Sequence, residues 1–370
     1  MQAIKICHFS SAHPSSDIRI FHKQCSSLSK EGFTVYLVVA NEENKIVNGV
    51  NIINVESINK SRFTRFLKTS KNVYSKAISI DADIYHFHDP ELLLYALKLK
   101  RKGKIVIYDV HEDVPKTILA KFWINKYLRN FVSILFKKFE NYIAKRLDYI
   151  ITATPHIRDR FLKVNPNTID INNFPLLSEL ASPVNWSDKS NEVCYIGALT
   201  QIRGLETLIE SVSKTINVRL NLAGQFDQNS FEENLKLKKD WDIVNNYGYI
   251  NRKETIQIMS KSKVGMVTFF PVPNHIDSQP NKMFEYMSAG IPVIGSFFPL
   301  WKEILEINEC GICVNPEDSE DISKAIKYLI ENEDTAEQMG KNGREAVLEK
   351  YNWGIEEKKL INIYKSLIKK

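Results

Sequence analysis

Apolar and polar positions along the first half of the chain follow two alternating patterns. Short apolar runs, each followed by a turn or a polar stretch, have the length and composition of buried β-strands. They lie at residues 4–9, 34–40, 50–55, 84–87, 105–108 and 149–153. Helical patterns lie between several of them, and the one at 17–31 ends before Gly32, a common helix terminator. Strands that alternate with helices predict a parallel, doubly wound α/β sheet.

Residues 173–191 have a different texture and separate this pattern from a second one. They include Pro175, Pro183 and several Ser and Asn residues without clear periodicity, which predicts a linker. After it we predict strands at 193–196, 218–223, 243–247, 264–269, 292–295 and 311–314, and helices at 205–214, 252–261 and 280–289. The predicted domains are therefore 1–172 and 192–350, with a final helix at 351–370 that packs back on the N-terminal domain. Two Rossmann-like domains of this kind would face a central cleft, where ligands commonly bind.

The composition is that of a globular protein. Of 370 residues, 44% are hydrophobic and 25% are charged. No apolar run approaches the roughly 18 residues of a membrane-spanning helix. Because the N-terminus also lacks the features of a signal peptide, we expect a cytoplasmic protein. Cys310 and Cys313 have redox-motif spacing, but further zinc ligands are missing nearby, and buried thiols are the simpler interpretation.

The net charge of +6 is distributed unevenly. Residues 1–180 contain 27 Lys+Arg and 17 Asp+Glu, a balance of +10, whereas the remainder contains 23 and 27, a balance of −4. A basic front half suits phosphate-bearing partners or an anionic membrane surface, although a solvated lysine-rich surface gives the same count.

Residues 121–146 carry much of this charge, with seven Lys+Arg and one Glu. Their apolar positions have helical spacing: Tyr127, Leu128, Phe131, Ile134, Leu135, Phe139, Tyr142 and Ile143. The pattern predicts either an interfacial helix on anionic lipid or, more simply, a helix whose apolar stripe packs on the sheet.

The segment 277–294 has the strongest chemical pattern. Pro280 suits the first position of a helix, so Asn281 and Lys282 would lie in the first turn. A lysine beside the positive end of a helix is unfavourable unless an anion lies there too. Glu285 would follow one turn later, within reach of hydroxyl groups on the molecule that carries the anion. An ordinary amphipathic helix with a solvated lysine is the alternative.

A second anion-binding candidate begins at Gly197, where a predicted strand ends. Arg203 and Gly204 then stand at the entrance of a helix. The planar, permanently charged guanidinium group of arginine suits phosphate oxygens. Neither a G-x-G-x-x-G fingerprint nor a P-loop occurs in the chain, which argues against NAD enzymes and NTPases.

Histidines and carboxylates follow two strands of the first half. His86, His88 and Asp89 end one strand, and His111 follows the next, so all would lie at the carboxyl edge of the sheet. Three histidines with nearby carboxylates suit a metal site. However, there is no His-x-x-x-His pair, and adjacent residues on a strand point to opposite faces. We therefore predict no metal and a polar edge that contacts substrate, with helix capping by Asp89 and Asp113 as the alternative.

Taken in order along the chain, these features resemble the retaining glycosyltransferases of family 4, which have the GT-B fold. The similarity begins at His13-Pro-Ser-Ser-Asp17-Ile-Arg19 and continues through the histidine-bearing edges and Arg203-Gly204. It is most specific at 281–294, Asn-Lys-Met-Phe-Glu-Tyr-Met-Ser-Ala-Gly-Ile-Pro-Val-Ile. The resemblance covers nearly the whole chain.

The resemblance implies roles for residues of the second half. Arg203 and Lys282 would bind the donor diphosphate and neutralise charge on the leaving group, and Glu285 would hold the nucleotide ribose. Asp277 would contact hydroxyls of the transferred sugar. The donor-binding residues would also include Gly197 and Asn281.

In the first half, the resemblance places His111 beside the transferred sugar. His13, Arg19, His88 and Asp89 would lie on the acceptor side. The implied reaction transfers a sugar from a UDP- or GDP-sugar with retention of anomeric configuration, without a metal or another cofactor.

Two positions depart from the family pattern. Asp277 is one methylene shorter than the usual Glu, which puts its reach to the sugar in doubt. Ala198 replaces the first basic residue of the phosphate pair, so Arg203 and Lys282 would carry more of the charge.

Two other functions remain compatible with these residues: a sugar-nucleotide epimerase of the same fold, and a non-catalytic glycosyltransferase-like subunit. For a transferase, the basic front half fits a glycan or lipid-linked acceptor at the inner face of the plasma membrane. That setting is typical of bacterial surface polysaccharide synthesis, such as that of O-antigen or capsule. No feature indicates nucleic-acid binding.

Overall fold

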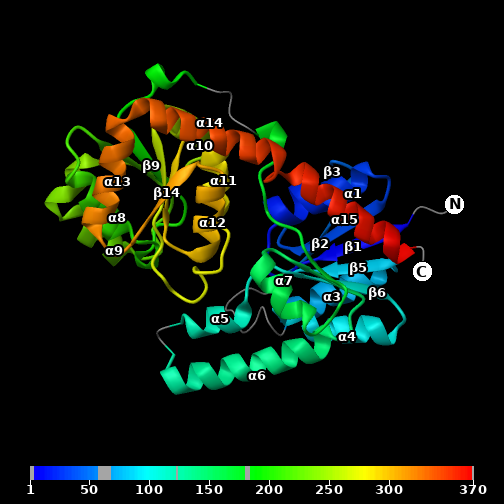
Figure 1. Cartoon of the computed structure of the whole chain (residues 1–370). Helices are drawn as coiled ribbons and strands as arrows, with labels where there is room; N and C mark the ends of the chain where they lie inside the picture. Colours follow the sequence, from blue (N-terminus) through cyan, green and yellow to red (C-terminus); the bar gives the residue numbers. More distant parts are fainter. Residues whose placement is uncertain (1–3, 57–67, 122–123, 180–183, 369–370) are drawn as a thin grey trace. The chain divides into compact units, whose positions relative to one another are not determined.

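The computed structural model of the chain describes residues 4–56, 68–121, 124–179 and 184–368. These residues form two compact units, each with its own sheet and core. The first unit combines Met1–Asn173 with Trp353–Lys370, and the second unit is Phe174–Asn352. In Figure 1 the first unit runs from blue to green and ends with the red C-terminal helix, and the second runs from green to orange.

The first unit contains a doubly wound sheet with the strand order β3-β4-β2-β1-β5-β6-β7-β8. Neighbouring strands are parallel except β3 and β4. The strands are β1 (Lys5–Phe9), β2 (Thr34–Ala40), β3 (Lys45–Val47), β4 (Val50–Val55), β5 (Ile84–Phe87), β6 (Ile105–Val110), β7 (Tyr149–Thr152) and β8 (Thr168–Asp170). The strand order reverses between β1 and β5, and ligands favour the carboxyl ends of strands at such a switch point.

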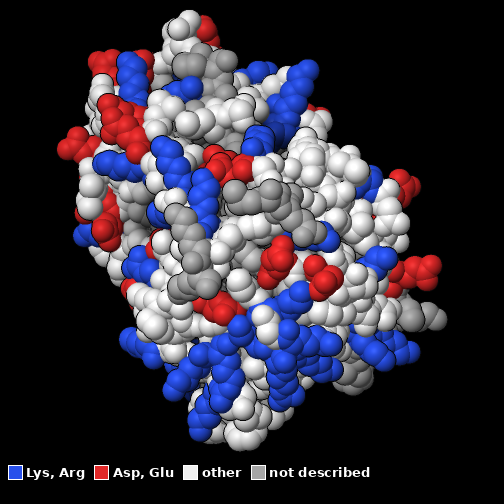
Figure 2. Space-filling view, turned by 90° about the vertical axis from the view of Figure 1, so that its right-hand side faces the viewer, with Lys and Arg blue, Asp and Glu red and all other residues white. Residues whose placement is uncertain are grey.

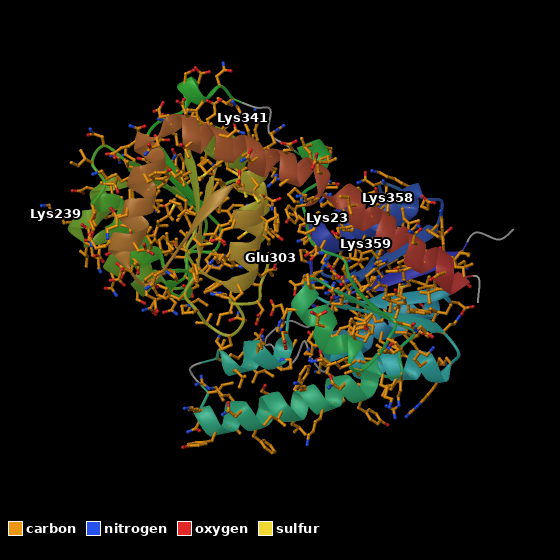
Figure 3. All side chains as sticks on the ribbon, in the orientation of Figure 1. Lys23, Lys239, Glu303, Lys341, Lys358 and Lys359 are labelled. Carbon is orange, nitrogen blue, oxygen red and sulfur yellow. The ribbon has the colours of Figure 1, made fainter. Side chains whose placement is uncertain are left out.

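Helices cover both faces of this sheet. They are a π-helical segment (Ile18–Cys25), α1 (Ser26–Lys30), α3 (Ser70–Ser79), α4 (Leu93–Arg101), α5 (Val114–Leu119), α6 (Lys126–Ala144), α7 (Pro155–Leu162) and α15 (Trp353–Ile368). Phe9, Tyr85 and Phe87 belong to an apolar core on one face that includes residues of α3 and α4. On the other face α15 packs against the π-helical segment and α1. Lys358 and Lys359 are labelled on α15 in Figure 3, and they lie between the buried residues Glu356 and Tyr364 of this helix.

The second unit contains a fully parallel sheet with the order β11-β10-β9-β12-β13-β14. Its strands are β9 (Glu192–Ile196), β10 (Arg219–Ala223), β11 (Val244–Gly248), β12 (Val264–Val267), β13 (Val293–Ser296) and β14 (Gly311–Val314). The helices are α8 (Leu205–Ser213), α9 (Asn229–Lys236), α10 (Arg252–Lys261), α11 (Asn281–Ser288), α12 (Pro299–Ile307), α13 (Ser319–Glu331) and α14 (Glu333–Glu349). The switch point lies between β9 and β12, so their carboxyl ends are the expected ligand edge.

The predicted pair of doubly wound α/β units is confirmed, and the strands predicted at 34–40, 50–55 and 84–87 have those bounds. The apolar pattern does not predict β3, a short strand on the sheet edge that pairs antiparallel with β4. The two residues between them, Asn48 and Gly49, both have positive φ. Asn-Gly with this geometry is the signal of a tight hairpin, which apolar periodicity does not reveal.

The described part of the predicted linker 173–191 is packed against the second unit rather than extended. Phe174 is buried, with ring centroids 4.7 Å from Phe284 and 5.4 Å from Tyr351. Trp186 is also buried in that core. Residues 180–183, including Pro183, lie outside the described residues.

The orientation of α6 contradicts the expectation that its apolar stripe packs on the sheet. Of the eight predicted apolar positions only Ile143 is fully buried, and Tyr127 is 83% exposed. The buried residues of α6 instead include Ser133, whose hydroxyl donates to the Pro115 carbonyl at 2.9 Å, and Glu140. Residues 122 and 123, which the predicted helix included, are not described. Among the described residues, no helix has the length and apolar character needed to cross a membrane.

The packing of α11 on the second sheet yields a prediction about stability. A Cβ added to Gly265 in β12 would lie 2.3 Å from Cγ of the buried Tyr286, so one of the two must move. We expect Gly265→Ala to lower the free energy of unfolding by about 1–3 kcal/mol, as measured by denaturant unfolding. The control is Gly295→Ala in β13, whose nearest neighbour is the end of the Leu305 side chain at 3.0 Å. Equal losses from the two substitutions would contradict the packing argument.

Candidate active site

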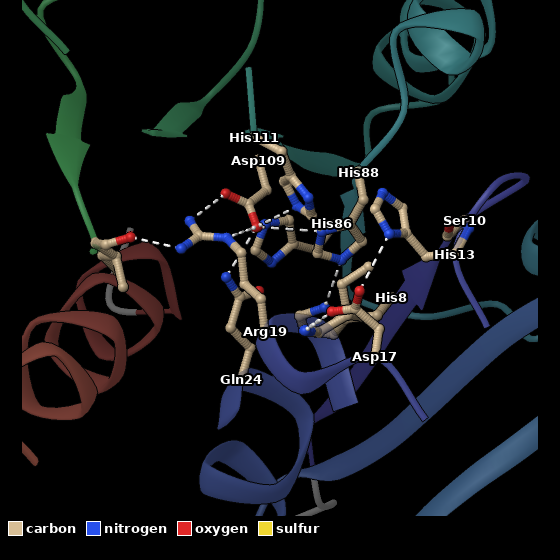
Figure 4. A network of polar contacts seen from close by, with 12 residues as sticks. His8, Ser10, His13, Asp17, Arg19, Gln24, His86, His88, Asp109 and His111 are labelled. Atoms are coloured by element: carbon tan, nitrogen blue, oxygen red, sulfur yellow. Dashed lines mark hydrogen bonds and ion pairs between the residues drawn. The ribbon is translucent and has the colours of Figure 1, made fainter. Parts of the chain in front are cut away.

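The carboxyl edge of the first sheet is organised around the fully buried carboxylate of Asp109 in β6. Arg19 donates to it from Nε at 3.0 Å and from Nη2 at 2.6 Å, and Gln24 Nε2 donates at 2.8 Å. His88 Nδ1 and His111 Nε2 lie 3.2 Å and 3.0 Å from Asp109 Oδ2. Figure 4 shows these side chains converging on the carboxylate.

Strand alternation explains why these residues meet. His8 pairs with His86 in the register of β1 and β5, so the two rings lie side by side on one face. His88 follows His86 by two residues, and His111 follows Asp109 by two, so each pair shares a face. Side chains of adjacent strand residues point to opposite faces, so they do not cluster. Side chains two residues apart share a face, and this spacing brings the histidines and Asp109 together.

The charges in this cluster follow from burial and pairing. Burial acts to raise the pKa of the Asp109 carboxyl, but Arg19 and His111 outweigh it and hold that pKa well below its usual range. Burial lowers the pKa of His88 to about 3, although Asp109 acts in the opposite direction. Asp109 is consequently ionised and His88 is neutral at physiological pH.

His13, on the loop after β1, forms the more exposed part of this edge. Its Nδ1 lies 3.1 Å from Asp17 Oδ2, its Nε2 lies 3.5 Å from Asp89 Oδ1, and its ring centroid is 4.9 Å from that of His111. Burial acts to lower the pKa of His13, but the hydrogen bond with Asp17 and the nearby carboxylates raise it overall. His13 therefore keeps its proton to a higher pH than an ordinary histidine.

In the second unit, the loop after β9 presents Arg203. Its guanidinium lies over the Phe269 ring, with Cζ 4.6 Å from the centroid. Gly204 is the residue before α8 and has φ +70°, and a Cβ there would lie 2.3 Å from the Thr268 carbonyl oxygen. Only glycine fits this position, which brings the α8 entrance against the end of β12.

Lys282, Glu285 and Arg252 form a charged group at the N-terminus of α11. Lys282 Nζ donates to Glu285 Oε2 at 2.8 Å, and Arg252 Nη1 donates to the same oxygen at 2.6 Å. Burial acts to raise the pKa of Glu285, but the two cations lower it overall. The anion beside Lys282 and the helix terminus is thus a carboxylate of the same helix.

Two contacts fix α11 against the sheet. The Tyr286 hydroxyl accepts from the Ile196 N–H at 2.9 Å, which ties the helix to the end of β9. Arg344 Nη1 in α14 donates to the Ser288 carbonyl at 2.6 Å at the other end of the helix. We predicted Pro280 as the first residue of this helix, but it is the residue before it. Asn281 is the first and Lys282 the second helical position. Both still lie in the first turn.

Comparison with known proteins agrees with this architecture. A family profile described as "Glycosyltransferase Family 4" matches residues 19–171, and one described as "Glycosyl transferases group 1" matches residues 178–346. An uncharacterised glycosyltransferase of Methanocaldococcus jannaschii is 23% identical over 341 residues, which are 86% of this chain and 85% of that protein. The capsular polysaccharide biosynthesis glycosyltransferase CapM of Staphylococcus aureus is 25% identical over 185 residues, 47% of this chain and 46% of that protein.

Solved structures share the fold over nearly the whole chain. Sucrose-phosphate synthase of Thermosynechococcus elongatus has a TM-score of 0.81 at 18% identity and covers 99% of both chains. Anabaena HepE in complex with UDP and glucose has a TM-score of 0.74 at 12% identity and covers 98% of this chain and 100% of its own. The chain is a GT-B glycosyltransferase.

In this glycosyltransferase the predicted acceptor-side residues lie together. His13, His88 and Asp89 gather near His111 at the carboxyl edge of the first sheet. Arg19 differs, because its guanidinium is buried and its hydrogen bonds go to Asp109 and to the Ile171 carbonyl. This arrangement favours a role for Arg19 in positioning Asp109.

The alternative that Asp89 and Asp113 cap helices is wrong, since neither side chain makes a capping hydrogen bond. Asp89 instead accepts from Ser10 Oγ at 2.8 Å and from the Ser11 N–H at 2.6 Å. It therefore fixes the loop that carries His13.

The predicted donor-side residues are distributed over neighbouring strand ends of the second unit. Gly197 follows β9, and a side-chain Cβ at this residue would lie 3.6 Å from Arg203 Nη1. Asp277 is half-buried in the loop before α11. At Ala198, the departure from the family pattern, the carbonyl accepts from the Tyr195 hydroxyl at 3.0 Å.

Sequence reasoning missed Arg252, His8 and Tyr364. Arg252 joins the donor side only through folding, since it lies 33 residues before Glu285. His8 could have been found from the pairing of β1 with β5, because it lies opposite His86. Nothing in the local sequence of α15 indicates that Tyr364 reaches this edge.

Two groups in the first unit have the composition of metal sites: His8, His86 and His88, and His88, Asp109 and His111. Within each group the potential ligand atoms lie within 4.8 Å of one another. In both groups some of these atoms are in hydrogen-bond contact with one another, as His8 Nδ1 and His88 Nε2 are at 3.0 Å and His111 Nε2 and Asp109 Oδ2 are at 3.0 Å. The expectation of a metal-independent enzyme stays a prediction.

The Arg19–Asp109 pair predicts a specific double-mutant result. Arg19→Met leaves a buried carboxylate without its cation, so we expect a loss of about 3–5 kcal/mol in the free energy of unfolding. Arg19→Met with Asp109→Asn should be more stable than Arg19→Met alone, as measured by urea unfolding. The wild-type pair should contribute to the free energy of unfolding at pH values above the pKa of Asp109 in the unfolded chain. That contribution should be lost as the pH falls through the lower pKa of Asp109 in the folded protein. A double variant no more stable than the single one would contradict this account.

Proposed function

We propose that this glycosyltransferase moves a sugar from a nucleotide-diphosphate sugar, a UDP- or GDP-sugar, to a glycan or lipid-linked acceptor with retention of configuration. The observation that carries the proposal is the group of Lys282, Arg252 and Glu285 at the N-terminus of α11, with Arg203 in the loop between β9 and α8. Cationic side chains near a helix N-terminus and a switch point form a binding site for a diphosphate. The solved relative with UDP and glucose supports the same ligand class.

Glu285 gives this site an exchange mechanism. Without donor, its carboxylate pairs with both Lys282 and Arg252, and the group keeps a net charge of about +1. A bound diphosphate would take over these two cations, and the released carboxylate would accept hydrogen bonds from the ribose hydroxyls. Arg252 thereby supplies positive charge that Ala198 does not. Lys282, Arg203 and Arg252 would stabilise the negative charge that develops on the leaving group.

The transfer step needs no cofactor beyond these side chains. The bond between the anomeric carbon and the diphosphate oxygen breaks, and a bond to the acceptor oxygen forms on the same face of the sugar. The departing phosphate oxygen takes the acceptor proton. His111 is held by Asp109 through Nε2, and its Nδ1 would accept a hydrogen bond from a sugar hydroxyl and so orient the donor.

The donor side yields a kinetic prediction. Lys282→Ala should raise the Kd for the nucleoside diphosphate and lower kcat/KM by about 100-fold or more, because a charge-assisted contact at the leaving group is lost. Cys313→Ser, also in the second unit but outside this group, should change neither quantity much. Normal activity of Lys282→Ala would overturn the assignment.

Incubation of the wild-type protein with a panel of nucleotide sugars tests the function itself. Slow hydrolysis of one donor, with transfer once an acceptor is added, supports the transferase. Interconversion of the sugars would instead identify an epimerase, and neither binding nor turnover would identify a non-catalytic subunit.

We also propose that the first unit binds an anionic membrane surface through α6, as suits a lipid-linked acceptor in surface polysaccharide synthesis. The outward residues Phe131, Ile134 and Leu135 are each more than half exposed. A contiguous apolar surface of this kind on a soluble fold is typical of an interaction site. Tyr127 and Tyr142, also exposed, lie near the two ends of α6, where their polar tips suit a membrane interface.

The charge around this stripe favours lipid over a neutral protein partner. Lys126, Arg129, Lys137 and Lys138 lie on α6, and Lys145 and Arg146 follow it. Figure 2 shows lysine and arginine side chains gathered along the lower part of the face drawn, the level at which α6 and α4 lie in Figure 1. An apolar stripe flanked by basic residues is the pattern of a helix that lies in the headgroup region at the cytoplasmic face.

Vesicle sedimentation tests this surface. Lys137→Gln with Lys138→Gln should weaken binding to phosphatidylglycerol–phosphatidylcholine vesicles, at about 1 kcal/mol for each charge. The control is Lys239→Gln with Lys341→Gln, two exposed lysines labelled on the second unit in Figure 3. Equal binding by both double variants, or equal binding of the wild type to pure phosphatidylcholine, would contradict the proposal.

A further inference from the structure

A chain of side-chain contacts links α15 to the Asp109 carboxylate through the interior of the first unit. The Tyr364 hydroxyl oxygen lies 2.7 Å from His86 Nδ1 and 3.2 Å from His8 Nε2. His8 Nδ1 lies 3.0 Å from His88 Nε2, and His88 Nδ1 lies 3.2 Å from Asp109 Oδ2. Tyr364, His8 and His86 are all completely buried. Figure 4 shows the three histidine rings between Asp109 and the loop that carries His13.

The protons in this chain can be assigned from the Asp109 end. An ionised carboxylate accepts only, so it is best satisfied when both ring nitrogens that face it, His88 Nδ1 and His111 Nε2, carry a proton. These two nitrogens also lie 3.2 Å from each other, and the Asp109 oxygen that both contact serves as their shared acceptor. His88 is neutral, which leaves its Nε2 without a proton and requires His8 Nδ1 to donate to it. His8 is neutral as well, because burial lowers its pKa well below the usual value, so its Nε2 accepts from the Tyr364 hydroxyl.

The assignment continues to one end point. The Tyr364 hydroxyl directs its hydrogen toward His8, so its oxygen accepts a hydrogen bond from His86 Nδ1. Burial lowers the pKa of His86 well below the usual value, so this ring is neutral and its Nε2 carries no proton. Among the described residues, His86 Nε2 is a buried atom without a hydrogen-bond partner, which makes it the end of the chain. All the hydrogen bonds of the chain therefore run in one direction.

The reverse direction is unfavourable at Asp109. It would place a bare nitrogen of His88 against the carboxylate at 3.2 Å, where two acceptors repel each other. In the favoured direction the Tyr364 hydroxyl donates to His8 Nε2 and His8 Nδ1 donates to His88 Nε2, which keeps the His88 proton on Nδ1. Which nitrogen of a buried histidine is protonated is set by the partner of the other nitrogen.

We propose that Tyr364 and His8 are positioning residues for His111: through His88 and Asp109 they fix which ring nitrogen of His111 is free to accept a sugar hydroxyl. This inference rests on the sugar transfer proposed above. It assigns the C-terminal helix a part in the reaction although its residues contact no substrate. His111 keeps Nε2–H on Asp109, and its Nδ1 stays the acceptor.

Metal binding by His8, His86 and His88 is the competing interpretation of the same residues. His8 already uses both ring nitrogens, in contacts with Tyr364 and His88. The three-histidine group contains no carboxylate, so a divalent ion would bury its charge without an anionic ligand. The positive charge of Arg19 also acts on this group, since it contributes to lowering the pKa of His86.

Nitrogen NMR of the full-length protein with ring-¹⁵N-labelled histidine tests the chain directly. Long-range ¹H–¹⁵N correlations show which nitrogen of each ring carries the proton. We expect Nδ1–H for His8, His86 and His88, and Nε2–H for His111, with signals unchanged by EDTA. A proton on His88 Nε2, or a change on EDTA addition, would overturn the assignment whether or not the protein is active.

Kinetics then test the positioning role. Tyr364→Phe should return His8 and His86 to mixed tautomers and lower kcat by about tenfold, the order expected for the loss of one buried hydrogen bond, with little change in donor KM. The matched control is Tyr85→Phe, which removes a buried hydroxyl that accepts from the Ala82 N–H on the opposite face of the same sheet. Equal kcat values for the two variants would overturn the positioning role.

His8 offers a rescue experiment. His8→Asn retains an amide donor close to the position of Nδ1, whereas His8→Leu does not. We expect the asparagine variant to keep most of kcat and the leucine variant to lose about tenfold, at equal folded fractions by circular dichroism. Equal kcat values in these two variants would contradict the proposal. If the wild type transfers no sugar at all, the proposed function fails while the NMR result still decides the hydrogen-bond chain.

Discussion

The first unit depends on one constraint, the burial of an ionised carboxylate at Asp109. A charge without solvent must be surrounded by donors, and Asp109 has Arg19, Gln24, His88 and His111 around it. These donors come from the π-helical segment near the N-terminus and from the ends of two strands. The need to satisfy one buried group therefore sets the position of the side chains at this edge of the sheet. Arg19, which the sequence suggests as a substrate-binding residue, instead pairs with Asp109 in the interior.

The second unit uses a carboxylate in a different way. Glu285 also holds two cations, but its side chain is 14% exposed, whereas that of Asp109 is 0% exposed. A buried pair keeps its partners permanently, because separating it would leave an uncompensated charge in the interior. A pair that water reaches can exchange one anion for another at lower cost, since water screens the intermediate state. The first unit thus has a fixed carboxylate that contacts histidines, and the second has a more accessible one that suits the proposed diphosphate site.

Much of this architecture could be predicted from the sequence, because apolar periodicity marks the strands and helices of both units and motif order marks the ends of β9 and α11. What could not be predicted depends on contacts between distant positions. Arg252 joins Glu285 across 33 residues, and Tyr364 joins His86 across 278. The histidine cluster could be predicted in part. Its spacing of two residues on paired strands was visible, but it required the strand register, which the sequence alone does not provide.

The orientation of α6 shows how a polar group can decide which face of an amphipathic helix is buried. Glu140 accepts from the Tyr108 hydroxyl at 3.0 Å and from Arg160 Nη2 at 2.8 Å, and it is fully buried. Rotating the helix to bury Phe131 and Leu135 would bring this carboxylate into water and leave Tyr108 and Arg160 without it. The observed orientation keeps the polar contacts and leaves the apolar stripe in water, at a cost of about 25 cal/mol for each Å² of apolar surface. An external apolar surface would recover that free energy, so this orientation of α6 suits the proposed membrane surface.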